Sequence, residues 1–266
     1  MKPIYLKIPT IKESNYNKPI KTIIISSSNV DDLVYMINSL KEKHNHLSFD
    51  FYIIQNTSHR IDYKFRKSGL EYKYIKKNKS SLYEAINSLI NNFKEDDFVL
   101  VLSDQLIFMN NAVDSMINIF DQNILTIGVQ TLLSNQMIKQ QGILLITNRL
   151  NQDYAVRNIN SRTQLFNYDI KEVFANKVEC CLINIKAFKK VNGFNDKLLF
   201  LQDIELCSKG IINGYKNLVC NDGIAYDLST FDNICKDDVL YSMKQISNMI
   251  KLNKEKYVKY MEIFNG

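Results

Sequence analysis

Between residues 21 and 133, short apolar runs alternate with segments in which apolar residues recur every three or four positions. The short runs are typical of buried strands, and the spaced segments are typical of helices with one face on a core. The predicted strands are 21–29, 49–58, 72–77, 96–105 and 124–133, and the predicted helices are 30–43, 80–93 and 110–120. Strands that alternate with helices favour a mixed, mostly parallel α/β sheet flanked by helices.

Polar residues follow three of the predicted strands at the point where each strand ends. These polar endings are 26–29, 55–58 and 103–105. In an open α/β sheet, ligands bind beyond the carboxyl ends of the strands. The pattern therefore predicts a polar binding site along that edge of the sheet.

Beyond residue 135 the alternation is less regular. Strands are predicted at 141–147, 178–185 and 217–228, and helices at 185–194, 202–215 and 236–264. The last helix keeps one apolar face, with a polar interruption near Asn253. We predict an α/β domain over residues 1–232, with an N-terminal extension over 1–20, and a C-terminal helix over 233–266 that packs on the domain.

Composition narrows the class of protein only slightly. The 266 residues are 45% hydrophobic, which suits one sizeable domain with an appended helix. The formal net charge of +6 is spread over many lysines, and no nucleic-acid-binding motif is present, so we expect no nucleic acid partner. The basic stretch 64–79 is explained by a solvated edge strand or by contact with an anionic acceptor. For the Lys- and Tyr-rich tail, peripheral contact with a membrane is the alternative to packing on the core.

Cysteine usage bears on the compartment. The chain has five cysteines, an odd number, and no Cys-x-x-Cys motif, which favours a reduced protein over a disulfide framework. The first 14 residues lack the apolar stretch of a signal peptide, and no run approaches the ~20 apolar residues of a membrane span. These features predict a cytoplasmic protein, with peripheral membrane attachment left open.

Two adjacent blocks near the C-terminal third resemble a known family. "ECCLINIKAFKKVNGFND" (179–196) resembles the block G-x-x-x-L-I-R-R-x-x-F-x-x-V-G-G-F-D-E, and "LQDIELCSKGIINGY" (201–215) resembles E-D-x-D-L-C-x-R-x-x-x-x-G-Y, of the inverting, family-2-type glycosyltransferases of the GT-A fold. Four blocks that lie earlier in the chain occur in the same order as in the family: "IIISSSN", "YIIQNTS", "NKSSLYEAINSLI" and "FVLVLSDQLIF". The resemblance spans roughly residues 20 to 230. It implies a GT-A-like fold and transfer of a sugar, with inversion, from a nucleotide-sugar donor, with a UDP-sugar favoured. The implied acceptor is a glycan, a lipid-linked saccharide or a protein glycan.

The resemblance also assigns roles to individual residues. Asp203 is implied as the catalytic base, although its position at a helix start also suits a simple cap. A divalent ion, Mn²⁺ or Mg²⁺, would be held by Asp104 and Asp227, since carboxylate oxygens are ligands for hard cations. The residues implied to bind the donor are Ser26, Ser28, Asn29, Gln55, Asn56, Asn78, Ser80, Asp104 and Gln105.

Several positions depart from the family pattern. Gln105 stands where the second metal carboxylate is expected, and Gln55 stands where an Asp usually contacts the base. Gln202 replaces the Glu of the Glu-Asp pair, and Asp227 stands where many relatives have a His. Two alternatives follow: a catalytically impaired GT-A-like domain that binds nucleotide, glycan or a partner subunit, and an active enzyme that uses basic side chains in place of a metal. A nucleotidyltransferase shares the α/β layout but does not explain the two adjacent blocks.

Overall fold

The computed structural model describes residues 8–27, 29–55, 71–76, 81–95, 97–148, 154–158, 169–198, 200–229 and 236–264. Within these ranges, no helix is both long enough and apolar enough to cross a membrane.

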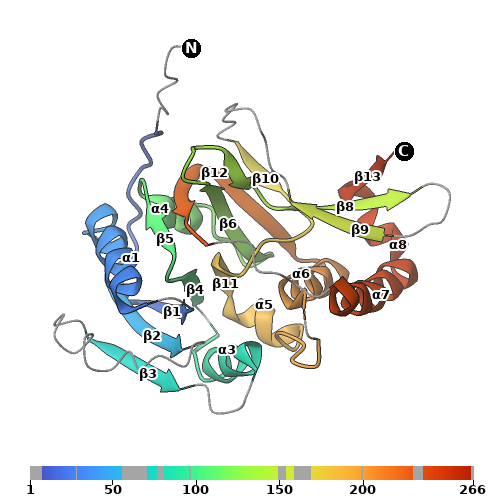
Figure 1. Cartoon of the computed structure of the whole chain (residues 1–266), viewed down its shortest axis with the longest axis horizontal. Coiled ribbons are helices and arrows are strands. Elements are labelled where there is room, and N and C mark those ends of the chain that lie inside the picture. Colours follow the sequence, from blue (N-terminus) through green and yellow to red (C-terminus); the bar gives the residue numbers. More distant parts are fainter. Residues whose placement is uncertain are drawn as a thin grey trace.

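The centre of the molecule is a mixed, mostly parallel sheet, as the sequence pattern predicts (Figure 1). Its order is β10-β12-β6-β11-β4-β1-β2-β3, with β5 paired to β12 and β7 paired to β6. The antiparallel β11 lies between β6 and β4. The bounds are β1 Ile20–Ser26, β2 Phe49–Gln55, β3 Tyr72–Lys76, β4 Phe98–Ser103, β5 Leu106–Phe108, β6 Ile124–Leu132, β7 Ile138–Gln140, β10 Ile170–Glu172, β11 Cys180–Asn184 and β12 Lys216–Asp227.

The strand directions bring many chain segments to one edge. Strands β1, β2, β3 and β4 are parallel, and β6 and β12 are parallel to each other. Because β11 is antiparallel to both β4 and β6, the strands β4 and β6 point the same way. The carboxyl ends of β1, β2, β4, β6 and β12 therefore share one edge, which we call the carboxyl edge.

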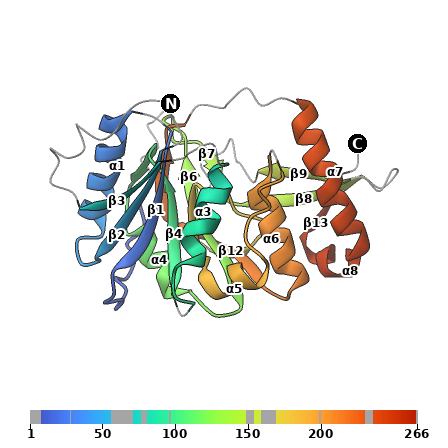
Figure 2. The same ribbon diagram turned by 90° about the horizontal axis from the view of Figure 1, so that it is seen from below.

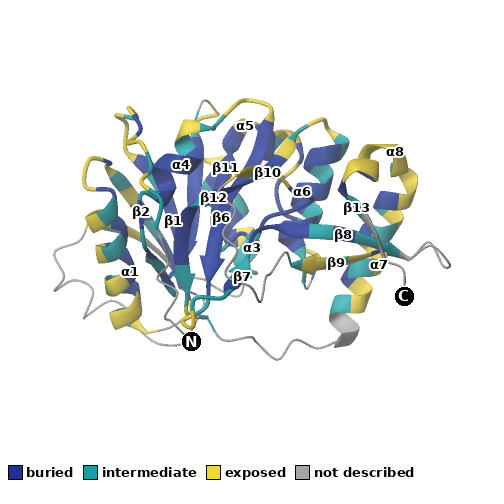
Figure 3. Cartoon of the chain, turned by 90° about the horizontal axis from the view of Figure 1, so that it is seen from above, coloured by how far each residue is buried: buried dark blue, intermediate teal, exposed yellow. Residues whose placement is uncertain are grey.

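Helices cover both faces of this sheet (Figure 2). α1 (Val30–Lys43) and α4 (Ala112–Asn118) pack on one face, and α3 (Leu82–Asn91), α5 (Ile185–Lys190) and α6 (Gln202–Ile212) pack on the other. Strand β4 is apolar throughout because successive side chains serve opposite cores: Leu100 faces the α1 side and Val101 the α3 side. Figure 3 shows the consequence, a sheet that is buried along its length between helices with exposed outer faces.

The C-terminal region forms a third cluster beside α6. α7 (Lys236–Leu252) and α8 (Lys254–Tyr257) are separated at Asn253, where the apolar face of the tail is interrupted. Ile246 and Ile250 of α7 share a core with Ile204 of α6. The Tyr257 hydroxyl lies 2.8 Å from the Ser208 hydroxyl, joining α8 to α6.

The end of the predicted tail helix is wrong. After the 3₁₀ turn Val258–Tyr260, residues Met261–Phe264 form strand β13, which pairs in parallel with β8 (Ile143–Asn148). With β9 (Tyr154–Asn158) these strands make a separate three-stranded sheet. The apolar positions of the tail fit a helical face, but pairing with β8 is a long-range interaction that the local pattern does not contain.

A buried histidine joins α1 to α4, away from the carboxyl edge. The His44 Nδ1 lies 2.8 Å from the Leu40 carbonyl oxygen, and its Nε2 accepts a hydrogen bond of 3.0 Å from the Val113 amide. The ring stands edge-on to Phe108, with centroids 5.4 Å apart. Burial lowers the pKa of His44 to about 4 from its ordinary 6.5, so the ring is neutral at pH 7.

Candidate active site

Three of the predicted donor-binding residues meet at the carboxyl edge. Ser26 is in register with Gln55 across β1 and β2, and the Asp104 amide donates a 3.1 Å hydrogen bond to the Ile25 carbonyl oxygen. The Asp104 side chain is only 1% exposed, and it accepts hydrogen bonds from the Ser26 hydroxyl at 3.0 Å and the Ser27 hydroxyl at 3.2 Å. The ends of β1 and β4 are thus tied together through one carboxylate.

The first turn of α1 borders the polar cradle that Ser26, Gln55 and Asp104 form. Asn29 is the N-cap of α1: its Oδ1 accepts from the Asp32 amide at 3.0 Å, and its Nδ2 donates to the Asp32 carboxylate at 2.9 Å. This local role explains why an Asn precedes the helix. Whether Asn29 also contacts a donor stays a prediction.

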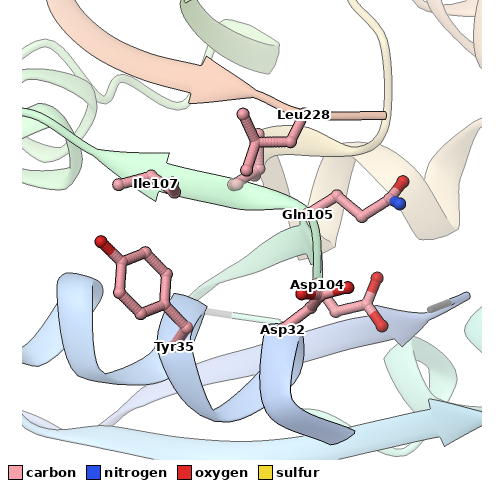
Figure 4. A pocket seen from close by; sticks show the side chains of 7 residues that line it. Asp32, Tyr35, Asp104, Gln105, Ile107 and Leu228 are labelled. Carbon is pink, nitrogen blue, oxygen red and sulfur yellow. The ribbon is translucent and has the colours of Figure 1, made fainter. Parts of the chain in front are cut away.

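A pocket of about 160 Å³ opens between α1 and the segment that follows β4 (Figure 4). Asp32 and Tyr35 of α1 line one side, and Leu228 lies across from them after β12. Its remaining lining residues are Asp104, Gln105, Leu106 and Ile107. The pocket therefore adjoins the Asp104–Gln105 turn on the α1 side of the sheet.

β5 brings the end of β12 beside this turn. Asp227 pairs with Leu106, and the Leu228 amide donates a 3.0 Å hydrogen bond to the Gln105 carbonyl oxygen. Asp227 thus lies beside the turn that contains Asp104 and Gln105. Its carboxylate, however, already has partners: Oδ1 lies 3.0 Å from Lys139 Nζ and accepts from the Ser229 amide at 2.9 Å and the Ser229 hydroxyl at 2.6 Å.

These contacts test whether a divalent ion fits between Asp104 and Asp227. Asp104 is engaged by two hydroxyls, Gln105 has no charge, and Asp227 is paired with an ammonium group. Among the residues that the structure describes, no three or more His, Cys, Asp or Glu side chains are grouped to hold a metal ion. The donor set therefore does not fit the ion predicted from the sequence, because the carboxylate at the end of β12 is neutralised from within the chain.

Asp203 lies at the start of α6, and the direction of α6 places it at the carboxyl edge. α6 precedes β12 and runs back along it, so the start of the helix lies near the end of the strand. Asp203 is 5% exposed, and its Oδ1 accepts a 2.8 Å hydrogen bond from the Ile204 amide. The residue before the helix, Leu201, has φ 63°. The side-chain Nε2 of Gln202 donates a hydrogen bond to the Leu198 carbonyl oxygen. Gln202 therefore secures the turn that presents Asp203.

Three charged or phenolic side chains around Asp203 were missed by sequence reasoning. Asp203, then Glu179 and Asp227, raise the pKa of Lys177, so its ammonium interacts electrostatically with all three carboxylates. Burial raises the pKa of Glu179, and its carbonyl oxygen accepts from the Ser103 amide at 2.7 Å. Burial, then Asp203 and Glu179, raises the pKa of Tyr83 in the first turn of α3. Lys177 and Glu179 stand just before the apolar run 180–185, which was the only available signal for them.

The turn before α6 is held by contacts from two helices. Gly193 has φ 58°, and its carbonyl oxygen accepts from Lys209 Nζ at 2.6 Å. Asn87 of α3 bonds both backbone groups of Phe194, with 2.9 Å for each hydrogen bond. The two blocks that resemble the family thus meet the α3 block in space, and together they fix the approach to Asp203.

The remaining predicted donor-binding residues, Ser28, Asn56, Asn78 and Ser80, lie outside the described residues.

Comparisons with known proteins address the fold. No known protein-family profile matches the chain, and no curated protein sequence matches it either. Solved structures do match. GalNAc-T7, solved with UDP, GalNAc and Mn²⁺, superposes with a TM-score of 0.66 at 10% identity, covering 88% of this chain and 48% of that one.

Two further structures superpose over a similar share of the chain. Residues 1–349 of TarS from S. aureus, in complex with UDP-GlcNAc, give a TM-score of 0.57 at 13% identity, covering 87% of this chain and 66% of that one. The mannosyltransferase PcManGT from Pyrobaculum calidifontis, in complex with GDP-Man and Mn²⁺, gives 0.55 at 9% identity, covering 86% and 62%. The chain spans about half to two-thirds of the length of these proteins. At such identities the likeness establishes the architecture, and the chain has the GT-A fold of these glycosyltransferases.

Proposed function

We propose that the chain transfers a sugar from a nucleotide-sugar donor to an acceptor hydroxyl, with inversion, and that Asp203 is the base. The observation that supports this most directly is the meeting of two groups at the carboxyl edge of a GT-A fold. One is the polar cradle of Ser26, Gln55 and Asp104, and the other is the carboxylate of Asp203 at the start of α6. The pKa of Lys177 is raised by Asp203 and, more weakly, by Asp227 beside the Asp104–Gln105 turn, so its ammonium interacts with both carboxylates.

The nucleobase and ribose of the donor are assigned to the polar cradle of Ser26, Gln55 and Asp104. Gln55 has both a donor and acceptors on its amide and suits a nucleobase edge, and Asp104 and Ser26 suit ribose hydroxyls. The pocket beside Asp104 offers further volume on the α1 side. UDP-sugars are the favoured donors, and a glycan or lipid-linked saccharide is the proposed acceptor.

The chemistry requires one base and no covalent nucleophile. Asp203 removes the proton of the acceptor hydroxyl as that oxygen bonds to the anomeric carbon. No step is assigned to a divalent ion, although two of the solved neighbours contain Mn²⁺, because Asp104 and Asp227 do not fit one.

A second candidate is a GT-A domain that binds a nucleotide or a glycan without turnover. The neutral Gln105 and the Lys139–Asp227 ion pair favour it, since both depart from the family's metal-binding pattern.

The test is a screen of UDP-, GDP-, dTDP- and CMP-sugars, with nucleotide release and thermal-shift binding measured on the same plate. We expect one donor to be turned over by the wild type and not by Asp203→Asn, with Asp196→Asn, an exposed acid in the preceding turn, as the matched control. Binding without turnover would favour the second candidate. Absence of both binding and turnover across the panel would refute the nucleotide-sugar assignment.

A further inference from the structure

The ammonium group of Lys139 forms an ion pair with Asp227, one of the two carboxylates that the family resemblance assigns to a metal ion. Lys139 belongs to β7, the short strand that turns back on the carboxyl end of β6 through Leu132 and Thr131. Its Nζ lies 3.0 Å from Asp227 Oδ1, 2.8 Å from the Ser229 carbonyl oxygen and 2.6 Å from the Ser229 hydroxyl. The ammonium group therefore donates two hydrogen bonds to Ser229 and forms an ion pair with Asp227.

The surroundings of the Lys139–Asp227 ion pair are more typical of a binding site than of the protein surface. The side chains of Lys139 and Asp227 are only 11% and 17% exposed, so the pair is largely removed from water. A buried ion pair generally adds little stability, because desolvation offsets the Coulombic attraction. A contribution to folding stability therefore does not explain the Lys139–Asp227 ion pair.

The charges nearby point to an anionic ligand. Gln105 removes one carboxylate from the turn that borders Asp227, and Lys139 adds a positive charge there. Lys177 places a second ammonium close enough to Asp227 for the carboxylate to raise its pKa. The neutral Gln105 and the ammonium of Lys139 both reduce the negative charge that a dication would otherwise neutralise. Lys139 and Lys177 each place a cation at the carboxyl edge.

We propose that Lys139 is the cation that receives the leaving diphosphate of the donor, and that transfer by this chain requires no divalent metal ion. This inference rests on the proposed function. In the step, the bond from the anomeric carbon to the diphosphate oxygen breaks and its electron pair goes to that oxygen. The acceptor oxygen bonds to the anomeric carbon, and its proton goes to Asp203. Lys139 stays protonated throughout and donates hydrogen bonds to the diphosphate as its charge grows.

The contacts of Ser229 allow Lys139 to bind the diphosphate without leaving the Asp227 carboxylate unpaired. The Ser229 hydroxyl donates to Asp227 and lies within reach of Lys139, so it can keep its bond to Asp227 while the ammonium turns one N–H toward a phosphate oxygen. Asp227 is then a positioning residue: it holds Lys139 in place and does not touch the donor.

Calorimetric titration of the whole chain tests the proposal, with UDP and GDP and their nucleosides uridine and guanosine as probes, each in EDTA and in Mn²⁺. We compare the wild type with Lys139→Ala, with Lys139→Arg, which keeps the charge, and with Lys244→Ala, an exposed lysine of α7, as the control. Wild type is expected to bind one nucleoside diphosphate in EDTA within about threefold of its affinity in Mn²⁺. Lys139→Ala is expected to lose roughly tenfold or more for the diphosphate in EDTA and nothing for the nucleoside, the size of one charged contact.

The outcomes separate this inference from the function on which it rests. Retained affinity in Lys139→Arg, together with unchanged nucleoside binding in Lys139→Ala, would exclude a folding defect and support the proposal. If wild type binds the diphosphate only with Mn²⁺, or if Lys139→Ala binds it as wild type does, the role of Lys139 is refuted and sugar transfer stands. If wild type binds neither UDP nor GDP under either condition, the role of Lys139 is refuted, and sugar transfer falls with it only if the whole panel of donors also shows no binding and no turnover.

Discussion

The two roles of Asp203, as a hydrogen-bond acceptor in the first turn of α6 and as the proposed base, can be separated by substitution. Asn keeps an oxygen that can accept the 2.8 Å hydrogen bond from the Ile204 amide but cannot accept a proton from the acceptor. Ala removes both the hydrogen-bond acceptor and the base. A comparison of the two variants therefore assigns each function to its own measurement.

The magnitudes follow from the contacts. Loss of a general base lowers the rate by about 10²- to 10⁴-fold, and both variants lose that factor. The hydrogen bond from the Ile204 amide contributes about 1 kcal/mol, which only the Ala variant loses. In a chain of this size that difference shifts the midpoint of thermal unfolding by roughly 2–4 °C. Asp203→Asn should therefore unfold like the wild type and be nearly inactive, and Asp203→Ala should be equally inactive and less stable.

The assay combines single-turnover nucleotide release, with the donor found in the screen, and thermal unfolding of the same samples. Asp196→Asn controls for the loss of a negative charge near α6. Asp203→Asn with more than about one tenth of wild-type turnover would refute the assignment of the base, since a base supplies at least about 10²-fold. A loss of stability in the Asn variant as large as in the Ala variant would refute a stabilising role for the hydrogen bond from the Ile204 amide.

Two further predictions concern the fold around the site. For His44, the folded-state pKa of about 4 lies below the ordinary 6.5, so the neutral ring stabilises the fold fully above pH 6.5 and loses this contribution as the pH falls toward 4. Urea unfolding should show about 2 kcal/mol less stability at pH 5 than at pH 7.5 from this group, and His44→Gln should show a correspondingly flatter profile; equal pH profiles would contradict the burial argument. Gly193→Ala should destabilise by roughly 1–3 kcal/mol, because φ is 58° and a Cβ would lie 2.6 Å from the Asn87 side-chain oxygen. Gly214→Ala, with φ 83° but nothing within 4 Å of the added Cβ, is the control for φ alone, and an equal loss in both variants would show that contact with Asn87 is irrelevant.

Much of the fold was predictable because its signals are local. Helix α1 occupies residues 30–43, as predicted, with Asn29 as its cap and acids in its first turn. Strands β1, β2 and β4 are apolar runs that end in polar residues, because both faces are covered by helices and the polar ends pair with one another at the carboxyl edge. The gathering of Ser26, Gln55 and Asp104 followed from this rule together with parallel pairing.

The errors lie where long-range pairing outweighs local pattern. Strand β13 continues an apolar face that suits a helix, yet its hydrogen-bonding partner is β8. The short strands β5 and β7, three residues each, were not predicted, because so short a run has no period of its own. These two strands nevertheless bring Asp227 and Lys139 to the Asp104–Gln105 turn.

By itself the sequence determined the α/β alternation, the polar edge of the sheet and the two blocks around Asp203, because periodicity, caps and strand ends are properties of neighbouring residues. Only the tertiary structure decided what surrounds the acids. Lys139 and Asp227 are 88 residues apart, and their ion pair depends on the positions of β7 and β12 beside β6. The electrostatic character of a site is the sum of charges brought together through space, so an acid that suggests a metal ligand in the sequence becomes, beside Lys139, the partner of an internal cation.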